Sequence, residues 1–220
     1  MCGRFTLHLP PEMIAEIFGV SLVSEVKPRF NVAPSQTHPV VRQTAEGRQL
    51  VFMKWGLIPN WAQDSRLGYS MINARAETID TKPSYRGSFR GRRCLVPADG
   101  LFEWLRHEGK TKQPFYVTIR SGGVMPFAGL WDRWQDPEGE SVETFTIVTC
   151  ASNELVSQLH DRMPVIIDRK DFATWLDPAA PPEKVKELLR PYPSEQMTLW
   201  KVGTLVNNPR IDLEECIKKI

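Results

Sequence analysis

Most of the chain alternates apolar and polar residues with the two-residue period of β-strands. The apolar runs are rich in Val, Ile, Phe and Thr, and glycine-rich or acidic turns separate them. This pattern predicts strands over residues 39–43, 49–55, 94–96, 114–119, 124–131, 144–150 and 197–202. Glu46-Gly47 stands between the first two predicted strands and favours a β-hairpin there.

Four shorter stretches show the wider apolar spacing of amphipathic helices. The first begins at Pro10-Pro11 and ends at Gly19, because proline is common at the start of a helix and glycine at its end. Ser152 is expected to cap a second helix that ends near His160. Two more helices are predicted over residues 168–176 and 182–189.

Two stretches interrupt this regular pattern. Residues 29–34, RFNVAP, are predicted to be irregular because they lie between turn residues. Residues 55–61, WGLIPNW, place glycine and proline beside two tryptophans and therefore predict a loop. Large aromatic side chains in a loop are usually covered by other residues or bind a ligand.

The length and composition indicate one domain. The chain has 220 residues, of which 41% are hydrophobic, which suffices for one core of generous size. No repeat, linker or low-complexity tract divides it. We therefore predict a single compact α+β domain over residues 1–220, with a mostly antiparallel sheet and peripheral helices.

The charge is nearly balanced, at +2 from 28 basic and 26 acidic residues, so it does not by itself indicate a nucleic-acid binder. Residues 85–93, YRGSFRGRR, nevertheless hold four arginines and no acid. The four cysteines form no CxxC pair and no zinc-site spacing, so no metal or other cofactor is expected. Without a signal-peptide core or an apolar run of membrane-spanning length, we expect a cytoplasmic protein with reduced thiols and no membrane contact.

The amino terminus, Met1-Cys2-Gly3-Arg4-Phe5, carries unusual chemistry. The small side chain after Met1 suits removal of that residue, which would leave an α-amine beside a thiol on Cys2. An α-amine titrates near pH 8, so about 10% of it is neutral and nucleophilic at pH 7. The amine can capture an aldehyde as an imine, and the sulfur can close that imine into a five-membered thiazolidine. The alternatives are an N-terminal nucleophile that hydrolyses amides, and a frayed terminus without function.

Three polar residues interrupt apolar surroundings and match the needs of imine chemistry. Asn73 could orient the amine, although it could equally bond its own turn. Glu103 lies between two aromatic residues. Either its carboxyl is buried, which would raise its pKa toward 7, or it lies on a strand and points outward into water. His160 titrates near neutral pH, and its alternative role is to stabilise a helix C-terminus.

Several other residues suggest contact with a nucleic-acid strand. Arg4, Arg75 and Arg162 each lie within two residues of a proposed catalytic position, where their guanidinium groups could bind phosphates. Ordinary salt bridges are the alternative for each. Pro34 and Trp61 offer apolar surfaces on which bases could stack.

Eight motifs occur in the order MCGRF, RFNVAP, WGLIPNW, INARAET, CLVPADGLFEW, KQPF, FTIVT and HDRMPV. In this order they resemble the SRAP domain proteins, the SOS response associated peptidase family, which shield abasic sites in single-stranded DNA. The resemblance covers nearly the whole chain and is least clear after Leu176. The resemblance implies a β-barrel-like sheet, a positively charged groove and a crosslink between Cys2 and the ring-opened sugar.

The resemblance also implies roles for the candidate residues. Asn73 would orient Cys2, Glu103 would assist ring opening, and His160 would shuttle protons. The three arginines would hold phosphates, while Pro34 and Trp61 would pack against neighbouring nucleotides. Some members have a second tryptophan where Ala62 stands here, so stacking at this edge would be weaker. The expected partner is abasic single-stranded DNA, bound by a monomer that associates with a bacterial-type nucleoid; a non-covalent strand binder and a hydrolase remain the alternatives.

Overall fold

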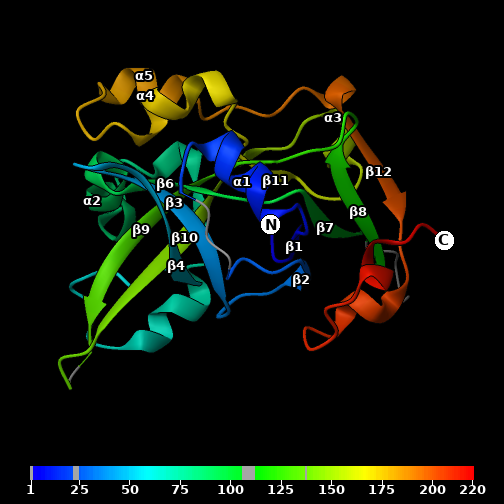
Figure 1. The fold of residues 1–220 in the computed structure, drawn as a ribbon, viewed down its shortest axis with the longest axis horizontal. Helices are drawn as coiled ribbons and strands as arrows, with labels where there is room; N and C mark the ends of the chain where they lie inside the picture. Colours follow the sequence, from blue (N-terminus) through cyan, green and yellow to red (C-terminus); the bar gives the residue numbers. More distant parts are fainter. Residues whose placement is uncertain (1, 22–24, 106–111, 137) are drawn as a thin grey trace.

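The computed structural model of the chain describes residues 2–21, 25–105, 112–136 and 138–220. Its frame consists of two β-sheets, with short helices around them (Figure 1). No helix among the described residues combines the length and apolarity needed to cross a membrane.

The larger sheet closes on itself as a barrel. Its strands run in the order β10, β4, β3, β6 and β9, and β10 also pairs with β9. Their bounds are Thr37–Thr44 for β3, Gly47–Trp55 for β4, Arg93–Val96 for β6, Phe127–Gln135 for β9 and Ser141–Ala151 for β10. The far end of β10 carries two short strands, β5 (Asn73–Arg75) in parallel and β11 (Arg162–Pro164) antiparallel. β10 also pairs in parallel with β4, so the sheet is mostly but not wholly antiparallel.

The smaller sheet carries the amino terminus. Its order is β12, β8, β7, β1, β2, and every pairing in it is antiparallel. The bounds are Phe5–Leu7 for β1, Arg29–Val32 for β2, Gly100–Leu105 for β7, Gln113–Ile119 for β8 and Met197–Lys201 for β12. β1 therefore lies between β2 and β7.

Five α-helices among the described residues lie around the sheets (Figure 1). They are α1 (Pro11–Phe18), α2 (Pro83–Gly91), α3 (Glu154–Ser157), α4 (Phe172–Leu176) and α5 (Pro182–Glu187). The buried guanidinium of Arg93 ties α2 to α4, because it donates to the carbonyls of Phe89, Arg90, Trp175 and Asp177. These carbonyls lie at helix C-termini, where they lack intrahelical donors.

Phe5 links β1 to the barrel core. Its fully buried ring lies 4.6 Å from the ring of His38, 5.0 Å from Trp55 and 5.8 Å from Phe127, measured between centroids. Asp99 adds a polar anchor, since its carboxylate accepts from the Thr6 hydroxyl at 2.5 Å and from the backbone N–H of Leu9 at 3.0 Å. The chain just after Cys2 is thus fixed by packing and by hydrogen bonds.

The structure confirms the α+β class, the hairpin, the helix ending at Gly19, and the barrel that the resemblance implied. RFNVAP is not irregular: its first four residues form β2, because the Asp212 carboxylate accepts the N–H groups of Phe30 and Asn31. The cap of α3 is Asn153 rather than Ser152. This helix ends at Ser157, well before His160, because the chain must turn to pair β11 with β10.

A substitution at Gly100 tests how tightly β1, β7 and β8 pack together. A Cβ atom there would lie 2.1 Å from the Tyr116 ring, so we expect Gly100→Ala to lower the free energy of unfolding by about 3 kcal/mol or more. Gly91→Ala is the matched control, because a Cβ atom there meets nothing within 4 Å and alanine favours a helix. Urea unfolding of both variants measures the difference; equal stabilities would contradict the tight contact.

Candidate active site

Cys2 lies at the junction of the two sheets. It precedes β1 in the smaller sheet and is fully buried. The Asn73 amide, on β5 of the larger sheet, donates from Nδ2 to the carbonyl oxygen of Cys2 at 2.8 Å. This contact joins residues that are distant in the sequence and confirms that the structure brings Asn73 to Cys2.

The other half of the Asn73 amide is a buried acceptor. Its Oδ1 is buried and has no hydrogen-bond partner among the described residues. A buried acceptor without a donor is costly, so such atoms often mark a site that another group completes. The hydroxyl of Tyr85 on α2 donates to the Asn73 carbonyl at 3.2 Å and so ties β5 to this helix.

Glu103 points into the protein rather than into water. Along β7, Phe102 and Trp104 face a small cluster with Tyr116, whereas Leu101 and Glu103 take the opposite face, toward the main core. Glu103 is 4% exposed, and this burial raises the pKa of its carboxyl to about 7, with the charge of Asp161 adding to the shift. The carboxyl can therefore both give and accept a proton at neutral pH.

The thiol of Cys2 is held in its protonated form. Burial raises its pKa above the ordinary value, and the negative charge of Glu103 raises it further. The backbone N–H of Phe102 donates to the Arg4 carbonyl at 3.0 Å, so the next residue, Glu103, lies beside the stretch of chain that leads to Cys2. An exposed thiol is a few per cent thiolate at pH 7, whereas this buried sulfur needs a base to take its proton.

His160 lies in the loop between α3 and β11. Its Nδ1 accepts the backbone N–H of Arg162 at 2.9 Å, which suits a neutral ring with its proton on Nε2. A carboxylate oxygen of Asp161 lies 2.8 Å from the same Nδ1 and can accept a proton from a charged ring. Both protonation states of His160 therefore have a partner, and Asp161 connects this loop electrostatically with Glu103.

Arg4 and Arg162 are engaged within the protein. Arg4 donates from Nη1 to Asn31 Oδ1 at 2.8 Å and to the Val206 carbonyl at 2.7 Å. Arg162 forms a two-point ion pair with Glu77, at 2.6 Å and 2.9 Å, so the salt-bridge alternative holds for it. The side chain of Glu77 is 52% exposed and that of Arg162 is 12% exposed.

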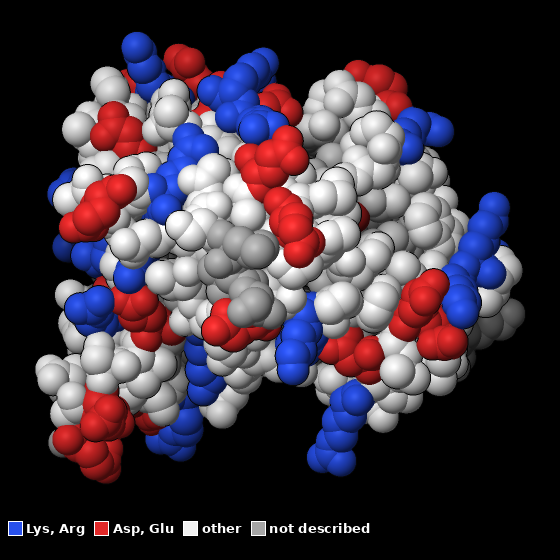
Figure 2. Space-filling model, in the orientation of Figure 1, with Lys and Arg blue, Asp and Glu red and all other residues white. Residues whose placement is uncertain are grey.

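The remaining predicted contacts are open to solvent to different degrees. Arg75 is exposed, Pro34 is half-buried, and Trp61 is 58% exposed in the loop after β4. β10 brings Arg75 and Arg162 together from two sides, because Arg75 pairs with Thr149 and Arg162 pairs with Ala151. Basic and acidic residues are interspersed over the face shown in Figure 2, which has no continuous basic surface.

Sequence patterns did not point to Glu77 or Asp161, because lone acids among polar neighbours are typical of any surface. The helix α2, which carries Tyr85, was also not predicted.

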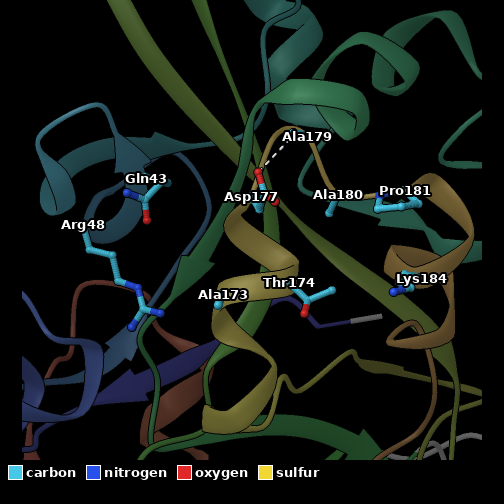
Figure 3. A pocket seen from close by; sticks show the side chains of 9 residues that line it. All are labelled: Gln43, Arg48, Ala173, Thr174, Asp177, Ala179, Ala180, Pro181 and Lys184. Carbon is cyan, nitrogen blue, oxygen red and sulfur yellow. Dashed lines mark hydrogen bonds between the residues drawn. The ribbon is translucent and has the colours of Figure 1, made fainter.

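A separate hollow of about 590 Å³ between the β3–β4 hairpin and α4–α5 contains Arg48 and Lys184 but none of the candidate residues (Figure 3). No group of three metal-ligating side chains occurs among the residues that the structure describes.

Comparison with known proteins places this chain in a family. The family model described as SOS response associated peptidase (SRAP) matches residues 1–209. The chain belongs to the SRAP family. It is 41% identical to the abasic site processing protein YoqW of Bacillus subtilis, over 99% of both chains. It is also 34% identical to the abasic site processing protein HMCES of Gallus gallus, over 88% of this chain and 67% of that protein.

A solved structure shows the same fold. An X-ray structure of a protein from Bacteroides thetaiotaomicron superposes with a TM-score of 0.90 at 27% identity and covers 100% of both chains. The resemblance stated from the eight motifs is therefore confirmed for the family and the fold. In this SRAP chain, Asn73 and Glu103 gather around Cys2, while Arg4 and Arg162 are occupied by internal partners.

The raised pKa of Glu103 predicts how stability depends on pH. The pKa lies near 4.5 in the unfolded chain and near 7 in the folded chain, so the folded state binds more protons between these values. Stability should therefore fall as pH rises from about 4.5 to about 7, by up to about 3 kcal/mol, and then level off. Glu103→Gln should remove this fall and be the more stable protein at pH 8. Thermal melts of both proteins at pH 5 and 8 test this, and parallel curves would contradict it.

Proposed function

We propose that the protein, after loss of Met1, forms a covalent thiazolidine between Cys2 and the ring-opened aldehyde of an abasic site in single-stranded DNA. The contact between Asn73 and the Cys2 carbonyl carries the proposal, because it brings the aminothiol residue to a polar group that can orient it. The relatives YoqW and HMCES are abasic site processing proteins, which supports abasic-site processing as the setting.

In the first step, the α-amine of Cys2 attacks the aldehyde carbon, and the resulting carbinolamine loses water to give an imine. Asn73 Oδ1, the buried acceptor without a partner in the described chain, is suited to hold an amine hydrogen. Glu103 at a pKa of about 7 can protonate the sugar oxygen as the ring opens and the hydroxyl as it leaves.

In the second step, the Cys2 sulfur adds to the imine carbon. The carbon–sulfur bond forms, and the thiol proton ends on the ring nitrogen, so one water is the only product lost overall. Because burial keeps the thiol protonated, a base must relay that proton. Glu103, whose charge acts on the thiol, is our candidate for the base, and His160 with Asp161 extends the relay toward solvent.

The DNA strand would follow the residues around this centre. We infer that Arg75 binds a phosphate directly, since it is exposed, and that Pro34 and Trp61 contact bases. Arg4 would act by holding the amino terminus as well as by its charge. Such a protein would work as a monomer on chromosomal DNA in a bacterial-type cytoplasm.

The central prediction is a stoichiometric adduct. We expect intact-mass measurement to show loss of Met1 and, after mixing with an abasic single-stranded oligonucleotide, a new mass equal to protein plus DNA minus water. Cys2→Ala should give no such adduct but should still bind the strand. Absence of the adduct with wild type would contradict the proposal, and repeated turnover of a peptide substrate would favour the hydrolase alternative.

Glu77 should weaken DNA binding, since its carboxylate occupies the guanidinium of Arg162 in the way a phosphate would. Glu77→Gln should therefore tighten binding of undamaged single-stranded DNA several-fold and steepen its salt dependence by about 0.7 in slope. Fluorescence anisotropy across salt concentrations measures both. Glu46→Gln, in the exposed turn after β3, is the matched control. Weaker binding by Glu77→Gln would instead show that Glu77 positions Arg162.

A further inference from the structure

A cleft between the Trp61 loop and helix α2 is a second candidate binding site. It encloses about 270 Å³, and its lining includes Asn60, Trp61, Ser84, Arg86, Arg90 and Arg92. All three arginines come from the acid-free stretch of residues 85–93, to which the proposed crosslinking chemistry assigns no role.

Asp132 builds the floor of this cleft. It is 4% exposed, and its carboxylate accepts the backbone N–H of Asn60 at 3.1 Å. The guanidinium of Arg92 reaches the same carboxylate, from Nη2 at 3.2 Å and from Nε at 3.2 Å. Asp132 thus fastens the tryptophan loop to the end of α2, and the charges of Asp132 and Arg92 offset each other.

Arg86 and Arg90 give the cleft its net positive charge. They are four residues apart on α2, so their side chains lie one turn apart on one face of the helix. Both are exposed, and within the described ranges neither forms an ion pair. Two uncompensated guanidinium groups at this spacing suit a phosphodiester, which offers several acceptor oxygens.

Trp61 provides an apolar wall beside these charges. Its loop is held by the indole of Trp134, which donates to the Ala62 carbonyl at 2.6 Å, and by the Ala62 N–H, which donates to Pro59 at 2.9 Å. The 58% exposed indole of Trp61 is therefore presented by a fixed backbone rather than a loose one. An exposed aromatic ring next to phosphate-binding cations is the usual composition of a single-strand binding site.

Helix α2 joins this cleft to the reactive centre. Tyr85 contacts the Asn73 backbone, and the next residue, Arg86, lines the cleft. We propose that the cleft binds one nucleotide of the same strand, on one side of the abasic site, with its phosphodiester on Arg86 and Arg90 and its base against Trp61. This inference rests on the proposed function and extends it, because it gives the protein a strand polarity.

The test uses two abasic oligonucleotides, one extended only on the 5′ side of the abasic site and one only on the 3′ side. At subsaturating DNA, Arg86→Ala/Arg90→Ala should slow adduct formation about tenfold with one of them and leave the other near the wild-type rate. Arg120→Ala, an exposed arginine that does not line the cleft, should leave both rates unchanged. Equal losses on both sides, or no loss, would overturn the proposal.

A second measurement distinguishes the contribution of the base from that of the phosphate. Trp61→Ala should slow the reaction about tenfold with the sensitive oligonucleotide, and this loss should vanish when base-free spacers replace its flanking nucleotides. The arginine variant should remain slow on the spacers. A Trp61→Ala loss that persists on spacers would overturn the assignment of a base to this wall.

These outcomes remain distinct from failure of the crosslinking proposal. If wild type forms no adduct, binding of an undamaged single strand by fluorescence anisotropy still tests the cleft. Arg86→Ala/Arg90→Ala should then reduce the salt slope by about 1.4, as expected for two lost contacts to a single strand. An unchanged slope in that measurement would overturn the cleft on its own.

Discussion

The placement of strand β1 between β2 and β7 is the constraint on which the site depends. Cys2 can meet Asn73 and Glu103 only if the few residues that follow it do not slide. Phe5, fully buried against three aromatic rings, contributes on the order of 2–3 kcal/mol of hydrophobic free energy to that placement. Asp99 then sets the register, because its carboxylate bonds groups on both sides of the strand's end. The chain from Phe5 to Leu9 is therefore held by packing and hydrogen bonds, although segments near a chain end often fray.

The chemistry is built from elements of both sheets. Glu103 comes from β7 of the smaller sheet, whereas Asn73 comes from β5 beside the barrel, and Cys2, the residue proposed to react, adjoins both. Burial of a carboxyl costs stability, yet the same burial brings its pKa to about 7, where proton transfer in both directions is efficient. Burial of Glu103 thus lowers the stability of the fold and gives the site a carboxyl that can transfer protons at neutral pH.

Local patterns predicted much of the fold and part of the site. The hairpin of β3 and β4 and the helix ending at Gly19 follow from turn residues and apolar spacing, which are local properties. β2 escaped prediction because its N–H groups are satisfied by Asp212, which lies far along the chain. The inward direction of Glu103 depends on which face of β7 meets the core, and the occupation of Arg162 depends on Glu77; neither is visible to a reading of neighbouring residues.

The burial of the Cys2 thiol affects its reactivity toward small oxidants and electrophiles. Peroxides and soluble electrophiles attack thiolates, and this sulfur is both shielded and kept protonated. Under the proposed function this protection matters, because a sulfur oxidised to a sulfinic acid could no longer close a thiazolidine. Under the proposed function, burial of the sulfur would confine its reaction to an aldehyde that a bound partner delivers into the site.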